Sequence, residues 1–95
     1  MFACVYARDN PDMVETRKET IAAHRAHLDD TPSDVRLHCS GPLLEGGVPC
    51  GSLFIYEADD SDRIVTFVNK DPNVVAGIYR SIEILEFDWR RGAPE

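Results

Sequence analysis

One helix-forming stretch of the sequence places an arginine and a histidine on the same side. Arg17 and His24 are seven positions apart, so on an α-helix their side chains would point the same way, about 10 Å apart along the axis. Val14, Ile21 and Leu28 repeat at the same helical spacing, which predicts that this stripe is the apolar, inward face of the helix. A buried arginine or histidine then needs polar partners, because an unpaired charge in a protein interior is costly.

Each of these two side chains could have a purely structural role instead of a chemical one. His24 alone could be a histidine satisfied within the core, and Arg17 could lie at the edge of the stripe with its guanidinium in water. Together on one face they instead suggest a general base and a cation that binds an oxyanion. His24 and His27 also form an H-x-x-H pair. We expect no metal site, because helical zinc pairs are usually four residues apart and the sequence has no third ligand nearby.

Two aspartates are candidates to pair with these side chains. Asp9 ends the first predicted strand, close to Arg17 in the fold we expect. Asp71 is followed by Pro72 and, six residues on, by Gly77, a pattern typical of the capping residue of a very short helix. The fixed φ of the proline and the helix N-terminus would hold the Asp71 carboxylate ionised and in place. Sequence spacing alone does not bring Asp71 to His24.

The elements that position these residues follow from hydrophobic periodicity and turn signals. A helix is predicted to begin at 10-NPD-12, with Asn10 as cap and Pro11 in the first turn, and to end near Asp29 or Asp30. The other predicted elements are strands over 2–8, 34–40, 52–58 and 79–89, a helix over 60–70 capped by Asp60 or Ser61, a short helix from Asp71, and a connection over 41–51. The order βαββαβ predicts an α+β, ferredoxin-like domain spanning residues 1–95, with helices on one face of an antiparallel sheet.

The predicted strands are apolar on both sides. Phe2, Cys4 and Tyr6 alternate with small apolar residues, and Leu53 alternates with Phe54. An open antiparallel sheet usually has one polar face, so we expect the second face to be covered as well. A chain of 95 residues has nothing left to cover it with except another copy. The sequence therefore predicts a homodimer with its two sheets face to face.

Composition excludes several classes of protein. The 43% hydrophobic content is that of a globular chain, and the net charge of −7 disfavours nucleic acid or an anionic membrane as a partner. The three cysteines are odd in number and lack C-x-x-C spacing, so we expect reduced thiols and a cytoplasmic protein. We find no signal peptide, no membrane-length apolar run, and no glycine-rich cofactor or phosphate motif. The sequence also lacks the basic-aromatic pattern of βαββαβ RNA-binding modules.

Four segments in order give the chain a family resemblance. It resembles the YciI-like (YCII-related) family over nearly its whole length through 9-DNPD-12, 17-RKETIAAH-24, 41-GPLLEGGVPCGSLFIYEA-58 and 68-VNKDPNVVAGIY-79. The resemblance implies a ferredoxin-like fold dimerised as an α+β barrel, in agreement with the argument from the strands. One departure is 21-IAA-23, where many members have Arg-Pro-Ala, so a basic residue near the pocket is missing.

The resemblance also assigns roles to individual residues. It implies a catalytic dyad of His24 and Asp71, with Pro72 fixing the orientation of Asp71. It also implies that Arg17 and Ser52 bind a substrate oxygen. Asp9 would support this site by holding Arg17. The activity associated with one member of the family is dehydrochlorination of a chlorinated hydroxyquinol.

Two functions are compatible with these residues. The first is a small general-base lyase or isomerase that needs no cofactor and acts on a hydroxylated aromatic or related small molecule, because a carboxylate-held histidine can take an acidic proton while Arg17 and Ser52 bind the oxyanion. The alternative is a non-catalytic, dimeric binding or accessory protein that uses the same pocket.

Overall fold

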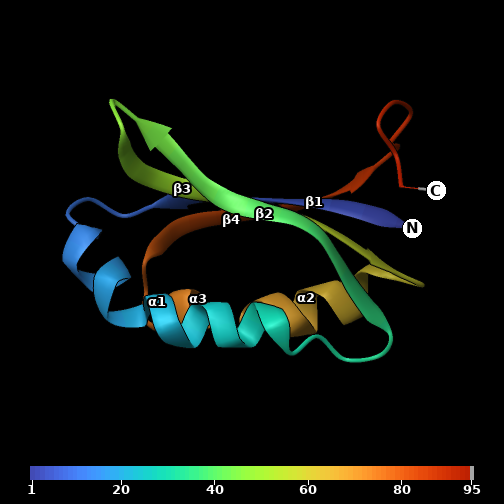
Figure 1. The fold of residues 1–95 in the computed structure, drawn as a ribbon, viewed down its shortest axis with the longest axis horizontal. Helices are drawn as coiled ribbons and strands as arrows, with labels where there is room; N and C mark the ends of the chain where they lie inside the picture. The colour runs from blue at the N-terminus through green and yellow to red at the C-terminus, as the bar shows by residue number, and fades with distance from the viewer. Residues whose placement is uncertain (95) are drawn as a thin grey trace.

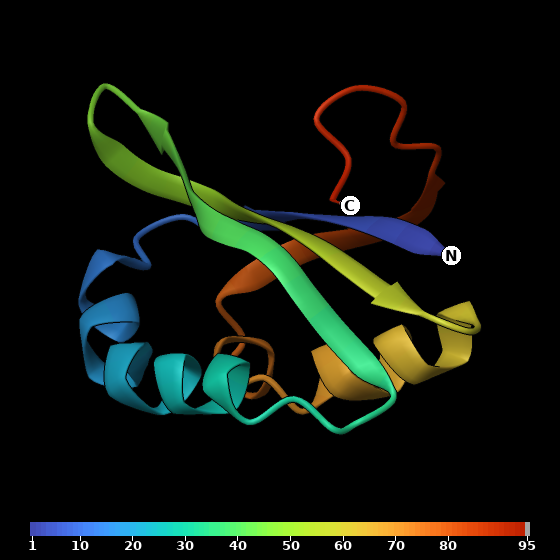
Figure 2. The same ribbon diagram turned by 45° about the vertical axis from the view of Figure 1, so that its right-hand side comes forward.

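A computed structural model describes residues 1–94 and confirms the α+β, ferredoxin-like order. Its elements are β1 (Phe2–Asp9), α1 (Val14–Asp29), β2 (Val35–Glu45), β3 (Val48–Ala58), α2 (Ser61–Asn69), α3 (Pro72–Val75) and β4 (Tyr79–Phe87). The strands form an antiparallel sheet in the order β2-β3-β1-β4. All three helices lie on one face of this sheet, and the other face carries no helix (Figures 1 and 2).

The connection predicted over 41–51 is wrong, because most of it is β-structure. β2 continues to Glu45 and β3 resumes at Val48, so the loop of this hairpin is only Gly46 and Gly47. Both glycines have positive φ, 57° and 80°, which two-residue hairpin turns require and other residues rarely adopt. The Gly-Gly pair was therefore the real turn signal. Pro42 is tolerated because β2 is an edge strand, and Pro49 because it precedes the part of β3 that pairs with β1, which begins at Gly51.

The packed core lies between α2 and the sheet. The Asp60 side chain caps α2 by accepting a hydrogen bond from the Arg63 backbone N–H at 3.2 Å, which resolves the choice of cap. Ile64, Phe67 and Val68 point from α2 into the core, where they join the buried faces of β1 and β3. Their i, i+3, i+4 spacing is what an amphipathic helix needs to close on a sheet.

α1 begins later than predicted. Its first residue is Val14, and Asn10 does not cap it; Asp12, which precedes the helix, has a positive φ of 61°. Asn10 instead ties two loops together. Its backbone N–H donates to the Ile78 carbonyl oxygen at 2.7 Å, and its side-chain amide donates to that of Gly77 at 3.0 Å. This tie fixes the start of α1 beside the segment that follows α3.

The sequence predicted that the apolar stripe of α1 faces a core, but of this stripe only Leu28 packs against the core cluster, and it is only partly buried. No residue of α1 is buried, and Ile21 in the middle of the stripe is 45% exposed. The stripe instead borders a hollow between α1 and the sheet. None of the helices within residues 1–94 is both long and apolar enough to cross a membrane.

The face of the sheet opposite the helices carries Cys4, Tyr6, Leu53 and Leu85, and the chain's C-terminal tail rises over one end of it (Figure 1). Phe2 and Trp89 both pack edge-on against the ring of His38, with centroids 5.4 Å and 5.7 Å away. His38 Nε2 donates to Glu57 at 2.8 Å, and the histidine side chain is only 6% exposed. The position of His38 on the polar side of its predicted strand would suggest a solvated side chain, and the structure shows instead that it is nearly buried. His38 lies on the face opposite the helices, as alternation requires, but Phe2 and Trp89 cover that part of the face.

Candidate functional site

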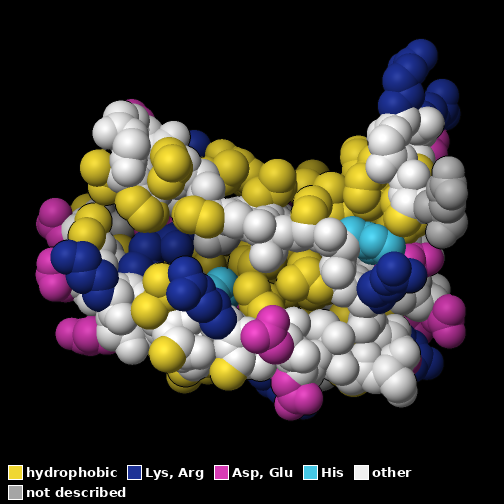
Figure 3. All heavy atoms as spheres, in the orientation of Figure 1, with side chains coloured by type: hydrophobic (Ala, Val, Ile, Leu, Met, Phe, Trp, Pro, Cys, Tyr) yellow, Lys and Arg dark blue, Asp and Glu magenta, His cyan; other side chains and the backbone are white. Residues whose placement is uncertain are grey.

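A cavity of about 440 Å³ lies between α1 and the sheet. Its apolar walls include Ile21, Leu28 and Phe54, and its hydrogen-bonding groups include Arg17, His24, Ser52 and Asn73. In Figure 3 basic side chains and a histidine surround this hollow at the surface. The stripe predicted on α1 is thus one wall of a cavity that is open to solvent.

His24 is held by a nearly buried carboxylate. Its Nδ1 lies 2.7 Å from Asp71 Oδ1, and the two side chains are 16% and 4% exposed. The same Asp71 oxygen accepts the backbone N–H of Asn73 at 2.9 Å and so caps α3, with Pro72 at the first helical position. Because a carboxylate only accepts, the ring proton lies on Nδ1. In the neutral imidazole the other ring nitrogen, Nε2, then carries the lone pair, and it makes no hydrogen bond within residues 1–94.

Arg17 is anchored by two bonds to one carboxylate. Its Nε and Nη2 donate to the two oxygens of Asp9 at 2.6 Å and 2.8 Å, with the side chains 14% and 6% exposed. The second Nη2 proton is shared between the Gly51 carbonyl oxygen, at 2.9 Å, and Ser52 Oγ, at 3.0 Å. The hydrogen bond to Asp9 raises the pKa of Arg17 further, against the opposing effect of burial. This fork–fork geometry holds a permanent cation in one orientation.

Ser52 is held so that its hydroxyl proton is free. Its Oγ accepts from Arg17 and, at 2.8 Å, from the hydroxyl of Tyr79. Burial raises the pKa of Tyr79, which keeps this phenol protonated and able to donate. A hydroxyl has two acceptor positions and one proton. Because both acceptor positions are used, the remaining function of Ser52 is to donate.

Thr20 and Asn73 connect the two halves of the site. Thr20 Oγ1 donates to Asn73 Oδ1 at 2.6 Å, and Asn73 Nδ2 lies 3.4 Å from the Tyr79 hydroxyl. Neither residue, nor Tyr79, was among the predicted site residues. Thr20 had a signal, because it lies three residues after Arg17 and four before His24 and so falls on the same helical stripe.

Gly51 brings the strand that carries Ser52 unusually close to β1. A β-carbon at this position would lie 2.3 Å from the Ala7 carbonyl oxygen, which is closer than such atoms approach. The absence of a side chain therefore allows the Gly51 carbonyl and Ser52 to reach Arg17.

His27 does not join His24 in a common site. Its ring stacks on Phe67 with centroids 4.1 Å apart, and its Nε2 donates to the Phe67 carbonyl at 3.0 Å. Within the described part of the chain, no group of three or more histidine, cysteine, aspartate or glutamate side chains is arranged to hold a metal ion.

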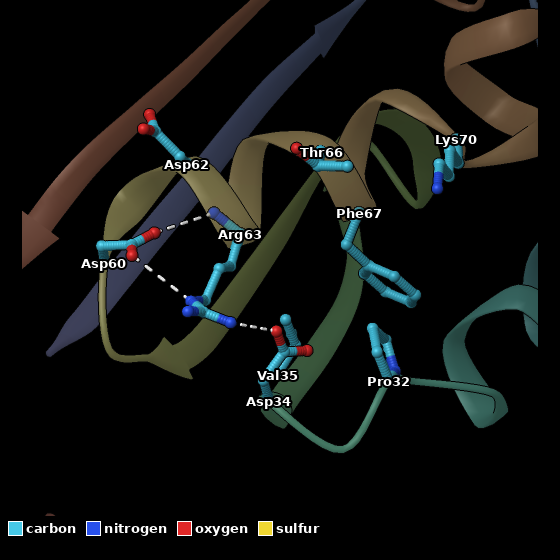
Figure 4. A pocket seen from close by; sticks show the side chains of 9 residues that line it. All are labelled: Pro32, Asp34, Val35, Asp60, Asp62, Arg63, Thr66, Phe67 and Lys70. Atoms are coloured by element: carbon cyan, nitrogen blue, oxygen red, sulfur yellow. Dashed lines mark hydrogen bonds and ion pairs between the residues drawn. The ribbon is translucent and has the colours of Figure 1, made fainter.

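A second cavity, of about 450 Å³, lies beside α2 and is shown in Figure 4. Arg63 crosses it and pairs with Asp34 and, at 3.3 Å, with Asp60. These groups are well exposed, Arg63 being 43% exposed, and no histidine lines this cavity. Exposed ion pairs of this kind contribute little to stability. The two cavities are similar in size, but of the two only the one beside α1 is lined by a histidine.

Sequence comparison identifies a domain family. The model of the YCII-related domain matches residues 1–88. The protein YciI of Escherichia coli and that of Shigella flexneri are each 29% identical to this chain over 94 residues, covering 92% of this chain and 96% of theirs.

Two solved structures illustrate the structural similarity. The 5-chloro-2-hydroxyhydroquinone dehydrochlorinase of Burkholderia phenoliruptrix, in complex with 2,5-dihydroxybenzoquinone, is similar with a TM-score of 0.80 and 26% identity, over 93% of this chain and 94% of that one. A NIPSNAP domain protein of Burkholderia xenovorans has a TM-score of 0.57 at 12% identity, over 99% of this chain and 98% of that one. The second likeness concerns the fold alone.

Proposed function

This chain belongs to the YCII-related family, and we propose that the cavity beside α1 is the active site of a general-base lyase or isomerase. Its substrate is a hydroxylated aromatic or a related small molecule. The observation that carries the proposal is the His24–Asp71 contact of 2.7 Å, which leaves His24 Nε2 available on the same cavity wall as Arg17.

His24 is the base in this proposal. The Asp71 carboxylate fixes its tautomer and stabilises the imidazolium that forms when Nε2 takes a proton. A positioned base of this kind contributes typically about 10²–10⁴-fold to the rate. Pro72 and the α3 N-terminus support Asp71, because they restrict its backbone and favour its negative charge.

Ser52 and Arg17 stabilise the oxyanion. The free hydroxyl proton of Ser52 can be donated to a substrate oxygen, and Arg17 Nη1 has no hydrogen-bond partner within residues 1–94. Asp9 positions Arg17 and prevents the guanidinium from rotating. One such donor contributes on the order of 10²–10³-fold.

Dehydrochlorination is a reaction that these groups can carry out by proton transfer alone. His24 takes a hydroxyl proton from a chlorinated hydroxyquinol and returns it to the carbon that bears chlorine. Removal of a second hydroxyl proton then expels chloride, so the ring loses HCl overall and becomes a hydroxyquinone. No electrons enter or leave, so the reaction needs neither an oxidant nor a reductant.

The comparison with the dehydrochlorinase supports this choice of substrate class. That protein is similar over nearly the whole of both chains and binds an oxygenated six-membered ring. A cavity of about 440 Å³ lies within the range of small-molecule sites.

The test uses 5-chloro-2-hydroxyhydroquinone as substrate and chloride release as the measurement. We expect turnover by the purified protein, loss of turnover in His24→Ala, and normal turnover in His27→Ala, which changes a histidine of the same helix outside the cavity. Equal activity of His24→Ala and the wild type would contradict the proposal. The binding-only alternative predicts thermal stabilisation by such compounds without turnover of any hydroxylated aromatic tested.

We also propose that two copies associate through the open face of the sheet to form a dimeric α+β barrel. Phe2, Cys4 and Tyr6 of β1 share that face with Leu53 and Leu85, and Leu85 is well exposed. Sedimentation equilibrium at micromolar concentration should give a dimer, and Leu85→Glu should shift it towards monomer. A monomeric wild-type protein would refute the association.

A further inference from the structure

The cavity beside α1 is lined by cations although the chain is acidic. Arg17, Lys18 and Arg25 all line it, and no aspartate or glutamate does. This contrasts with a sequence that has 17 acidic residues and 10 basic ones. Figure 3 shows basic side chains gathered over α1 beside the hollow. A ligand entering the cavity therefore meets positive charge first.

These cations differ in how far their charge is already used. Arg17 is neutralised by Asp9, which is nearly buried behind it. Lys18 lies 3.2 Å from Glu15, but both side chains are largely exposed, so this ion pair is weak and easily exchanged. Arg25 has no ion-pair partner among residues 1–94. It is thus the cation of this wall whose charge is available to a ligand.

Lys18 and Arg25 flank an apolar patch at the mouth of the cavity. They are seven residues apart, about 10 Å along the helix axis. Ile21 lies between them and is half-exposed. An aromatic ring can pack on Ile21 while an acidic substituent on that ring reaches Arg25. A single unpaired guanidinium matches the single charge and the two oxygens of a carboxylate.

We propose that the substrate of this site is a hydroxylated aromatic acid, with its carboxylate bound by Arg25 and assisted by Lys18. This inference rests on the proposed function, in which the hydroxyl group of the same substrate contacts His24, Arg17 and Ser52.

The test compares two probes of nearly the same shape, 2,5-dihydroxybenzoate and its neutral amide, 2,5-dihydroxybenzamide. Isothermal titration calorimetry on the wild type should show the carboxylate binding about tenfold more tightly or better, the range of a charge-assisted hydrogen bond. Arg25→Gln should reduce the preference to a few-fold at most. Arg91→Gln should keep it, because it makes the same charge change in the exposed tail at the other end of the molecule.

Three results would overturn the inference: equal affinities for acid and amide, an unchanged preference in Arg25→Gln, or no binding of either probe at millimolar concentration. The measurement reads binding and not turnover. A protein that binds the acid selectively but converts no substrate would keep Arg25 as the binding site of the carboxylate and defeat the enzymatic proposal, so the acid would be a ligand and not a substrate. Turnover of neutral quinols without any preference for the acid would support the enzymatic proposal and overturn the inference about the carboxylate.

Discussion

α1 and α2 cover the same face of one sheet, yet only α2 closes on it. Ile64 of α2 is fully buried, whereas Ile21 of α1 is 45% exposed. α2 is therefore held by apolar burial, the dominant stabilising contribution in most domains. α1 stands over a cavity and is tied down by polar contacts, Arg17 to Asp9 and His24 to Asp71.

This difference explains why the candidate site lies under α1. A closely packed helix leaves no room for a ligand, while a helix held by buried hydrogen bonds can border a hollow and keep its side chains in fixed orientations. The groups that hold α1 in place are also the groups proposed to bind and deprotonate the substrate. In this half of the molecule, the residues that hold the helix in place are thus also the candidate functional residues.

The strongest test of the comparison replaces the capping aspartate of each region by asparagine, in two separate variants. Asp71→Asn keeps a good N-cap for α3 but removes the charge that stabilises a protonated His24. We expect chloride release to fall about 10²-fold or more. Asp60→Asn, the matched change at the cap of α2, should leave activity unchanged. Similar rates for the two variants in a steady-state assay would remove the distinction between the caps.

A second test changes one isoleucine in each helix. Ile64→Ala should lower the free energy of unfolding by about 2–5 kcal/mol, the usual range for a large-to-small change in a core. Ile21→Ala should lower the free energy of unfolding by less than about 1 kcal/mol, since little packing is lost. It should also reduce the affinity of the cavity for aromatic ligands. Urea denaturation measures both free energies. Equal losses would mean that α1 is packed as tightly as α2.

A third test substitutes alanine for a glycine at two positions near the cavity. Gly51→Ala should cost about 1–3 kcal/mol, because the new methyl group would lie 2.3 Å from the Ala7 carbonyl oxygen and push β3 away from β1. Gly41→Ala is the control, since a β-carbon there meets nothing within 4 Å. Thermal unfolding of both variants checks the prediction, and a stable Gly51→Ala protein would show that the sheet can relax there.

The smallest effect concerns alkaline pH. The raised pKa of Tyr79 means that the folded state keeps this proton above about pH 10, where an unfolded tyrosine loses it. Its contribution to stability is therefore fully present below that pH and is lost as the pH rises through the folded pKa. Urea denaturation at several pH values up to and above 10 should show a shallower decline for Tyr79→Phe than for the wild type. Identical slopes would indicate that this phenol titrates normally.

The sequence was sufficient for the elements whose signals are local. α2 could be placed because Ile64, Phe67 and Val68 repeat with the helical period after a capping aspartate. The hairpin could not be placed from the sequence. Taken alone, the prolines and glycines over 41–51 indicate a loop, and these residues become strand only because β2 and β3 hydrogen-bond to each other. Asn10 was misassigned for a similar reason. Its partners, Gly77 and Ile78, are distant in sequence, so no local pattern could show that it ties two loops together.

For the candidate site, the sequence by itself determined that Arg17 and His24 share one face of a helix and that Asp71 begins a short one. Helical periodicity and proline geometry are local properties, so they are visible without a fold. Only the tertiary structure decided that this face borders a cavity instead of a core. It also decided that Ser52 is left with a free proton. Both outcomes depend on groups from β1, β3, α3 and β4, which meet only when the sheet forms and brings the ends of distant segments together.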